Sequence, residues 1–342
     1  MINREYGSDF HYISSQIYRE DKNTCFFEKE VQFYFSGRVA LKVVLLDSIA
    51  YRSLNKLYVP SYYCHEVYDY IKDLNIVIEF YECNPLKNKL PADIEDKIDH
   101  GIIVVNYFGL GSPSLTGYKN LITIEDLTHN LELIEESNAD YVFGSLRKIL
   151  PMPVGGFVKT KNTLSQLTKS DFAEEVTLEK LTGMVLKKKY LEGTFKEKEV
   201  FRDLLMNAET SFENSQTFTS LPLLLENYFF ELEIAKIIDI KKKNSNLAKE
   251  NLIAHSSFSL LSNSLNTEFS LILKFESVEQ RDELKNYLIS KQIYPMVLWP
   301  NQIYQDDMIL EKTILFIHID FRYSSEDILH ITNNINHFYN NA

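Results

Sequence analysis

Lys148 is the residue of this sequence whose type and place could do covalent chemistry. It follows the short β-rich run 141–145 and stands directly after Arg147. A lysine amine that is partly desolvated and close to another cation has a lowered pKa, and its neutral form makes a Schiff base with an aldehyde. A lysine in such a loop is more often a solvated side chain, so the interpretation depends on other residues.

Asp126 and His129 provide that support. Asp126 ends the apolar run 121–126. A carboxylate there could pair with the protonated nitrogen of a pyridine ring, and a ring held in its protonated form is a stronger electron sink. His129 could hydrogen-bond a phenolic oxygen of the same ring. The plainer interpretations are that Asp126 caps the next helix and that His129 is structural.

A phosphate site could begin at Ser36-Gly37-Arg38, which precede the helical pattern 39–51. Backbone N–H groups at the start of a helix bind phosphate, and glycine lets the backbone approach closely. Ser145 could add a hydroxyl group. The alternative is a simple N-cap at Ser36.

An aromatic segment follows another short run. Tyr63 lies in Pro60-Ser61-Tyr62-Tyr63-Cys64 and could stack on a pyridine ring. The chain holds 21 Tyr and 22 Phe, so one aromatic residue is weak evidence by itself. Taken together, the lysine, the carboxylate and the phosphate-binding turn predict a pyridoxal-phosphate (PLP) site.

The elements that must position these residues alternate between strands and helices up to about residue 160. Such alternation predicts an α/β fold with a largely parallel sheet, whose ligands bind at the carboxyl ends of the strands. The expected strands are 57–60, 76–82, 102–107, 121–126, 141–145 and 157–159, with helices over 39–51 and 65–74 between them.

The second part of the chain has a different pattern. Residues 162–254 read as helical and end in one long pattern over 225–252. Strands over 269–275 and 313–319 and helices over 278–291 and 325–338 then describe a small α+β unit. Single cores stop growing at roughly 250 to 300 residues. We therefore predict a large domain over 1–245 and a small C-terminal domain over 246–342.

Composition excludes several classes of partner. The formal net charge of −12 disfavours nucleic acid, because phosphate-backbone binding needs clustered Lys and Arg. The basic runs 187–189 and 241–243 are interpreted as solvated helix faces. Cys25, Cys64 and Cys83 are odd in number and form no CxxC pair, so neither disulfides nor a zinc site is expected. No apolar run reaches about 18 residues, and we expect a soluble cytoplasmic protein without a membrane or metal site.

These residues resemble the DegT-like (DegT/DnrJ/StrS) sugar aminotransferases, which are fold-type I PLP enzymes. The resemblance covers roughly residues 30–342. In chain order, 36–41 resembles the phosphate loop Ser-Gly-Thr-x-Ala-Leu, 59–61 the ring-stacking loop, 104–109 a strand ending in His-x-x-Gly and 125–129 the motif Glu-Asp-Ala-Ala-His/Gln. Lys148 keeps the family's spacing to Gly155-Gly156.

Three departures mark a divergent member. Ser145 stands three residues before Lys148, where the usual pattern has five, and Arg38 replaces the Thr of the phosphate loop. The usual segment through which a second subunit reaches the active site is also not found before the long helical pattern.

The resemblance implies a fold-type I protein with a mostly parallel seven-stranded sheet that works as a homodimer with PLP. Lys148 would carry the cofactor aldehyde and Asp126 would pair with the ring nitrogen. The implied activity moves an amino group from an amino acid such as glutamate to a keto-sugar, in polysaccharide or secondary-metabolite biosynthesis.

Arg322 supports a first alternative. It ends a strand of the small domain, and its planar guanidinium could clamp a substrate carboxylate through two hydrogen bonds. That would favour an amino-acid transaminase or lyase of the same fold. The other interpretation of Arg322 is a salt bridge between domains. A second alternative is a protein that keeps the fold without turnover and serves in binding or regulation.

Overall fold

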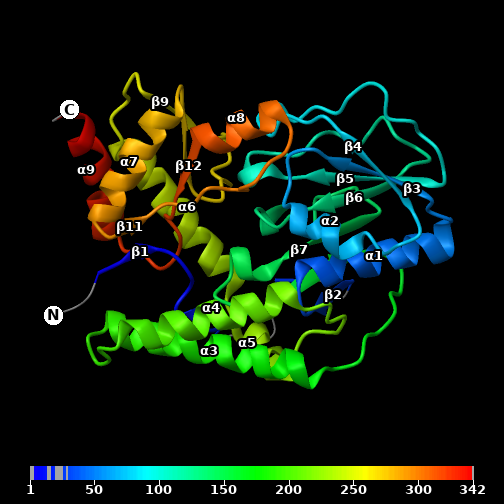
Figure 1. Ribbon diagram of the computed structural model, residues 1–342, viewed down its shortest axis with the longest axis horizontal. Coiled ribbons are helices and arrows are strands. Elements are labelled where there is room, and N and C mark those ends of the chain that lie inside the picture. The colour runs from blue at the N-terminus through cyan, green and yellow to red at the C-terminus, as the bar shows by residue number, and fades with distance from the viewer. Residues whose placement is uncertain (1–3, 14–16, 20–25, 28–29, 341–342) are drawn as a thin grey trace. The chain divides into compact units, whose positions relative to one another are not determined.

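The computed structural model describes residues 4–13, 17–19, 26–27 and 30–340 (Figure 1). Cys25 therefore lies outside the described residues. The chain divides into two compact units. The large unit contains residues 10–107 and 111–233, and the small unit contains the segment up to Asp9, residues 108–110 and the chain from Ile234 onward.

A seven-stranded sheet forms the centre of the large unit, within the part of the chain that the structure describes. Its order is β2-β8-β7-β6-β5-β3-β4. The five strands from β7 to β4 run parallel, whereas β8 is antiparallel to both of its neighbours. The strands are β2 (Val31–Tyr34), β3 (Lys56–Pro60), β4 (Val77–Tyr81), β5 (His100–Val105), β6 (Ile122–Asp126), β7 (Tyr141–Ser145) and β8 (Gly156–Lys159). The predicted fold class is confirmed.

The strands nearest the predicted site are buried along almost their whole length. Every residue of β5 and β6 is buried. Continuous burial is typical of parallel strands covered on both faces. The α-helices of this unit are α1 (Gly37–Arg52), α2 (His65–Ile71), α3 (Asp171–Leu191), α4 (Lys198–Asn214) and α5 (Leu223–Glu231). Two single turns of 3₁₀-helix, η3 (Leu131–Leu133) and η4 (Leu146–Lys148), follow β6 and β7.

The helices α3 and α4 form a hairpin and lie side by side in Figure 1. Gly183 on α3 allows this close approach, because a Cβ atom there would lie 2.9 Å from the Leu205 Cγ on α4. Lys180 precedes Gly183 by three residues on α3, Glu209 follows Leu205 by four residues on α4, and their side chains form an ion pair. The hairpin therefore brings Lys180 opposite Glu209.

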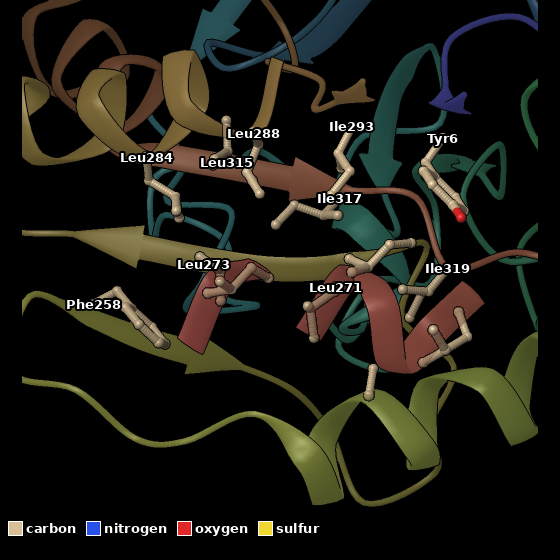
Figure 2. Packing of buried hydrophobic residues seen from close by; sticks show 14 of the residues in the cluster. Tyr6, Phe258, Leu271, Leu273, Leu284, Leu288, Ile293, Leu315, Ile317 and Ile319 are labelled. Atoms are coloured by element: carbon tan, nitrogen blue, oxygen red, sulfur yellow. The ribbon is translucent and has the colours of Figure 1, made fainter. Parts of the chain in front are cut away.

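The small unit contains a three-stranded antiparallel sheet of order β12-β10-β9. Its elements are α6 (Ile234–Asn251), β9 (Phe258–Leu261), β10 (Leu271–Phe275), α7 (Val278–Ser290), β11 (Ile293–Tyr294), α8 (Gln305–Thr313), β12 (Ile314–Ile317) and α9 (Ser325–Asn340). Alternate residues of β10 and β12 enter one apolar core, including Leu271, Leu273, Leu315 and Ile317 (Figure 2).

The N-terminal segment belongs to this small unit. Tyr6 is buried in its core (Figure 2), and β1 (Tyr6–Gly7) pairs in parallel with β11. Gly7 has φ +94°, and a Cβ atom there would lie 2.3 Å from the Tyr294 carbonyl oxygen. Only glycine fits at that position.

The prediction of one long helix over 225–252 is wrong, because the chain forms two helices there. Leu232, between α5 and α6, has extended backbone angles (φ −69°, ψ 132°). The N–H of Glu233 donates to the Ile17 carbonyl oxygen at 2.8 Å, and Leu232 forms a β-bridge with Tyr18. These bonds to a distant segment end α5. The domain boundary predicted between residues 245 and 246 lies within α6 and stays a prediction.

Candidate active site

Parallel pairing brings the predicted site residues of the large unit to one edge of the sheet. In the β5–β6–β7 region, Asp126 pairs with Val105 on one side and Phe143 on the other. Ser145 ends β7 two residues after Phe143, and η4 then carries Lys148. The carboxyl ends of parallel strands lie at the same edge, so these groups face one region.

Asp126 is a buried carboxylate, with 3% of its surface exposed. Its Oδ1 accepts a hydrogen bond from the Thr128 N–H at 2.8 Å, and its Oδ2 accepts one from the Tyr63 hydroxyl. Burial raises the pKa of Asp126, although both hydrogen bonds act in the opposite direction. No Lys, Arg or His among the described residues forms an ion pair with it. A buried carboxylate without a cation is costly, so this site favours a cationic partner.

Helix capping does not explain Asp126. The turn that follows β6 is η3, and its cap is Asn130, whose Oδ1 accepts from the Glu132 N–H at 3.2 Å. The plainer interpretation of Asp126, as the cap of the next helix, is therefore wrong.

Tyr63 contacts the site through its hydroxyl group. The residue is buried, and its ring lies 5.5 Å from that of Tyr68. Burial raises the pKa of the Tyr63 phenol well above its usual value. The hydroxyl therefore stays protonated and donates a hydrogen bond to Asp126. Stacking of Tyr63 on a cofactor ring stays a prediction. The hydrogen bond had no signal in the sequence, since the aromatic segment indicated only ring faces.

His129 is buried beside Lys148. Burial, and then the Lys148 charge, lower the pKa of His129 to about 3. The imidazole is therefore neutral at ordinary pH and carries one N–H donor. Its assignment to a phenolic oxygen stays a prediction.

Ser36 caps α1, as the plainer interpretation of that segment expects. Its Oγ accepts from the Val39 N–H at 3.1 Å. This bond uses one of the first N–H groups of the helix. The first turn of a helix has further N–H groups without acceptors inside the helix, so the start of α1 suits an anion.

Gly37 and the Gly155-Gly156 pair hold the start of α1 against the end of β7. A Cβ atom on Gly37 would lie 3.2 Å from the Ser145 Cβ, and one on Gly156 would lie 2.2 Å from the Ser36 carbonyl carbon. Ser36 also forms a parallel β-bridge with Gly155. The glycines therefore allow the turn at Ser36 to approach Ser145 closely.

The side chain of Arg38 extends to α4. Its Nη2 donates to the Phe212 carbonyl oxygen at 3.0 Å, and the guanidinium lies 5.0 Å from the Phe212 ring centre and 5.6 Å from that of Tyr70. Its backbone N–H, by contrast, lies at the start of α1. Cofactor binding by Arg38 stays a prediction.

Lys148 lies in a cluster of charges that the sequence did not indicate. The Arg147 Nη2 lies 2.7 Å from the Glu209 Oε1, and the Lys180 Nζ pairs with the Glu209 Oε2. The Arg147 charge, followed by burial, lowers the pKa of Lys148 to about 8, against an opposite effect of Glu209. Lys148 itself has no ion pair within the part of the chain that the structure describes. Only Arg147 had a signal in the sequence, as the neighbour of Lys148.

Arg322 lies in the small unit, and its guanidinium is already engaged there. Nε and Nη2 donate to the two carboxylate oxygens of Asp320 at 2.8 Å each, and Nη1 donates to the Ser8 and Asp9 carbonyl oxygens at 3.2 and 3.1 Å. The ion pair lies within one unit and does not link two. A carboxylate clamp at Arg322 stays a prediction without support from these contacts.

Other expectations concern absences. None of the helices in residues 4–13, 17–19, 26–27 and 30–340 is long and apolar enough to cross a bilayer. Among the same residues, no three His, Cys, Asp or Glu side chains group as metal ligands would. Cys64 and Cys83 are free thiols.

Comparison with solved structures places this fold. Sugar aminotransferase CalS13 from Micromonospora echinospora has a TM-score of 0.56 and 12% sequence identity, over 90% of this chain and 86% of that one. A DegT DnrJ EryC1 StrS aminotransferase from Brucella abortus has a TM-score of 0.56 and 13% identity, over 90% and 85%. Spr1654 from Streptococcus pneumoniae, provisionally described as a sugar aminotransferase and solved in its PLP form, has a TM-score of 0.64 and 11% identity, over 98% of both chains.

No protein-family model matches the sequence, and no curated protein matches it. The fold of this chain is that of the fold-type I aminotransferases. Within that class it is shared with the DegT-like sugar aminotransferases, as the motifs predict.

Proposed function

We propose that this protein is a PLP-dependent aminotransferase that moves an amino group from an amino acid such as glutamate to a keto-sugar. The observation that carries the proposal is Asp126, a buried carboxylate at the sheet edge that has hydrogen-bond donors but no cation among the described residues. The carboxylate lacks a cationic partner, and a protonated pyridine nitrogen would supply one.

The residues present fit PLP at both ends of such a site. Asp126 would hold the ring nitrogen, and the neutral His129 can donate to the phenolic oxygen. The start of α1, together with the Ser145 hydroxyl beside Gly37, would hold the phosphate. Lys148 would hold the aldehyde carbon. When bound, the cofactor would supply an aldehyde group and an electron-withdrawing ring.

Lys148 is suited to proton transfer at its Nζ. A group with a pKa of about 8 holds a proton part of the time near neutral pH, so it can both accept a proton and return one. Asp126 stays fixed by Tyr63 and Thr128, which orient its carboxylate before any ligand binds.

The sugar substrate and the donor rest on the resemblance. The structures that share the fold include proteins named as sugar aminotransferases, and Spr1654 is described in PLP and PMP forms. We extend this to a keto-sugar acceptor, a role in polysaccharide or secondary-metabolite biosynthesis, and a cytoplasmic homodimer. Sedimentation should then give a mass near twice 40.0 kDa, and a monomer that binds the cofactor tightly would contradict the dimer.

Absorbance and peptide mapping test the proposal. The purified protein with PLP should show a visible band that glutamate removes, and reduction with borohydride should place the label on Lys148. Lys159 is a matched control, because its Nζ already donates to the Ile134 carbonyl oxygen at 3.0 Å and pairs with Glu135. A label on Lys159, or on Lys161, would refute the assignment of Lys148.

The two alternatives predict different spectra. An amino-acid transaminase or lyase would complete its cycle with amino acids alone, although the Asp320 ion pair removes the observation that favoured it. A binding or regulatory protein would hold the cofactor, and no amino donor would convert it.

A further inference from the structure

Three charged residues near Lys148 are joined by ion pairs through one shared carboxylate. Glu209 on α4 is the shared anion of two cations, Arg147 on η4 and Lys180 on α3. Lys180 is almost completely buried, and its side chain is 6% exposed. Such a shared carboxylate needs three elements packed together, since each residue comes from a different one. We call Arg147, Glu209 and Lys180 the ion triad.

The remaining charged and titratable groups near Lys148 come from the elements on its other sides. Cys64 at the start of α2 and His129 after β6 both interact with the Lys148 charge. Glu66 and Arg38 interact with Cys64, and Glu213 interacts with Glu209 and Arg147. His129 is neutral, and burial raises the pKa of the Cys64 thiol, so neither carries charge near neutral pH. Of the charged groups, Arg147 and Glu209 of the ion triad have the largest effects on the pKa of Lys148, and Lys180 acts in the same direction as Arg147.

Within the triad, the two cations and the one carboxylate change the pKa of Lys148 in opposite directions. Arg147 is its direct chain neighbour, and a cation close to an ammonium group disfavours the protonated form. Glu209 attracts the same ammonium group, but much of its charge is balanced by Arg147 and Lys180. The balance leaves a net positive charge beside the amine.

We propose that the ion triad sets the protonation state of Lys148: Arg147 and Lys180 favour its neutral amine, and Glu209 holds both cations in place while limiting their effect. This inference rests on the proposed function, because a neutral amine is what an aldehyde group requires. Arg147, Lys180 and Glu209 are positioning residues here. They act on the cofactor only through Lys148.

The test measures the pH dependence of Lys148 nucleophilicity in the cofactor-free protein. Trace acetylation with acetic anhydride, followed by peptide mass spectrometry, reports the neutral fraction of this one amine at each pH. The wild-type midpoint is expected near pH 8. Arg147→Gln should move the midpoint to higher pH and Glu209→Gln should move it to lower pH. At a fixed pH below the midpoint, the labelling rate changes about tenfold when the midpoint moves by one pH unit.

Conservative and matched variants separate this role from simple damage to the site. Arg147→Lys keeps the charge and should keep the wild-type profile, whereas Lys180→Gln should move it to higher pH. Arg202→Gln is the control, because Arg202 pairs with Glu199 on the same helix α4 at 3.3 Å but on the exposed surface. Its profile should not move.

Opposite shifts from Arg147→Gln and Glu209→Gln support the inference. Loss of packing alone would move the Lys148 midpoint of both variants to higher pH, toward that of an ordinary lysine. That outcome, or unchanged profiles, would overturn the inference. If Arg147→Gln does not fold, as judged by circular dichroism, Lys180→Gln and Glu209→Gln must still move in opposite directions.

A second measurement distinguishes failure of the ion-triad inference from failure of the proposed function. PLP with borohydride tests whether Lys148 takes up the aldehyde at all. Lys148 without a PLP label would reject the proposed function, while the acetylation profiles would still decide whether the triad controls its charge.

Discussion

Replacing Asp126 by Asn removes a charge and keeps the shape of the side chain. In the wild-type protein one carboxylate oxygen accepts from the Thr128 N–H at 2.8 Å and the other accepts from the Tyr63 hydroxyl. An amide has one oxygen and one NH₂ group, so its oxygen can still accept from the Thr128 N–H while its NH₂ donates to the Tyr63 hydroxyl oxygen, and the hydroxyl proton loses its acceptor. A buried donor that loses its acceptor costs about 1 to 3 kcal/mol, partly offset because the buried charge is gone.

The effect on activity should be larger than the effect on stability. An amide cannot hold a pyridine nitrogen in its protonated form, and losing a charge-assisted buried contact costs about 2 to 4 kcal/mol in the transition state. That corresponds to roughly 30- to 1000-fold in rate. The variant should keep its cofactor and turn over poorly.

Single-turnover kinetics with glutamate, followed through cofactor absorbance, measures this loss. Tyr63→Phe is the matched comparison, because it removes one hydrogen bond and leaves the charge of Asp126 in place. Its rate should fall by less than that of Asp126→Asn. Near-normal turnover in Asp126→Asn, or an equal loss in both variants, would refute the reasoning that the carboxylate charge is what the site uses.

Three further predictions concern packing, pH and Arg322. Gly156→Ala should lower the free energy of unfolding by about 1 to 3 kcal/mol in urea denaturation, because its Cβ would lie 2.2 Å from the Ser36 carbonyl carbon. Gly117→Ala is the control and should be close to neutral, because a Cβ there would have no atom within 4 Å. Equal losses in the two variants would contradict the packing argument. Burial opposes the charges of Arg147 and Lys180, but these prevail and lower the pKa of Glu209 to about 2 from the ordinary 4.5. The stability from Glu209 is therefore present above pH 4.5 and is lost as the pH falls toward 2, by at most about 3 kcal/mol, and the difference in unfolding free energy between wild type and Glu209→Gln should shrink over that range. Arg322→Ala should destabilise the protein by about 3 to 5 kcal/mol, because the buried Asp320 carboxylate loses its guanidinium and is left with His318, whose Nδ1 lies 3.5 Å from Oδ2. A stable variant that loses only the glutamate half-reaction would instead restore the carboxylate clamp.

The sequence by itself determined six of the seven strands of the large unit's sheet and the chain positions of the main candidate residues, whereas β2 was not expected. Runs such as 121–126 and 141–145 are short, apolar and bounded by polar residues, and they form β6 and β7 within a residue of the expected limits. Because a parallel sheet collects the carboxyl ends of its strands at one edge, Asp126 and Lys148 could be assigned to one site before any contact was known.

Only the tertiary structure decided what surrounds those residues. The Tyr63 hydroxyl on Asp126, and Glu209 and Lys180 beside Arg147, join segments that are distant in the chain. Local pattern carries no information on such pairs, since helical periodicity predicts which face of α3 or α4 is buried but not which residue it meets. The break between α5 and α6 has the same cause, because bonds from residues 17–19 override an apolar periodicity that continues through Leu232.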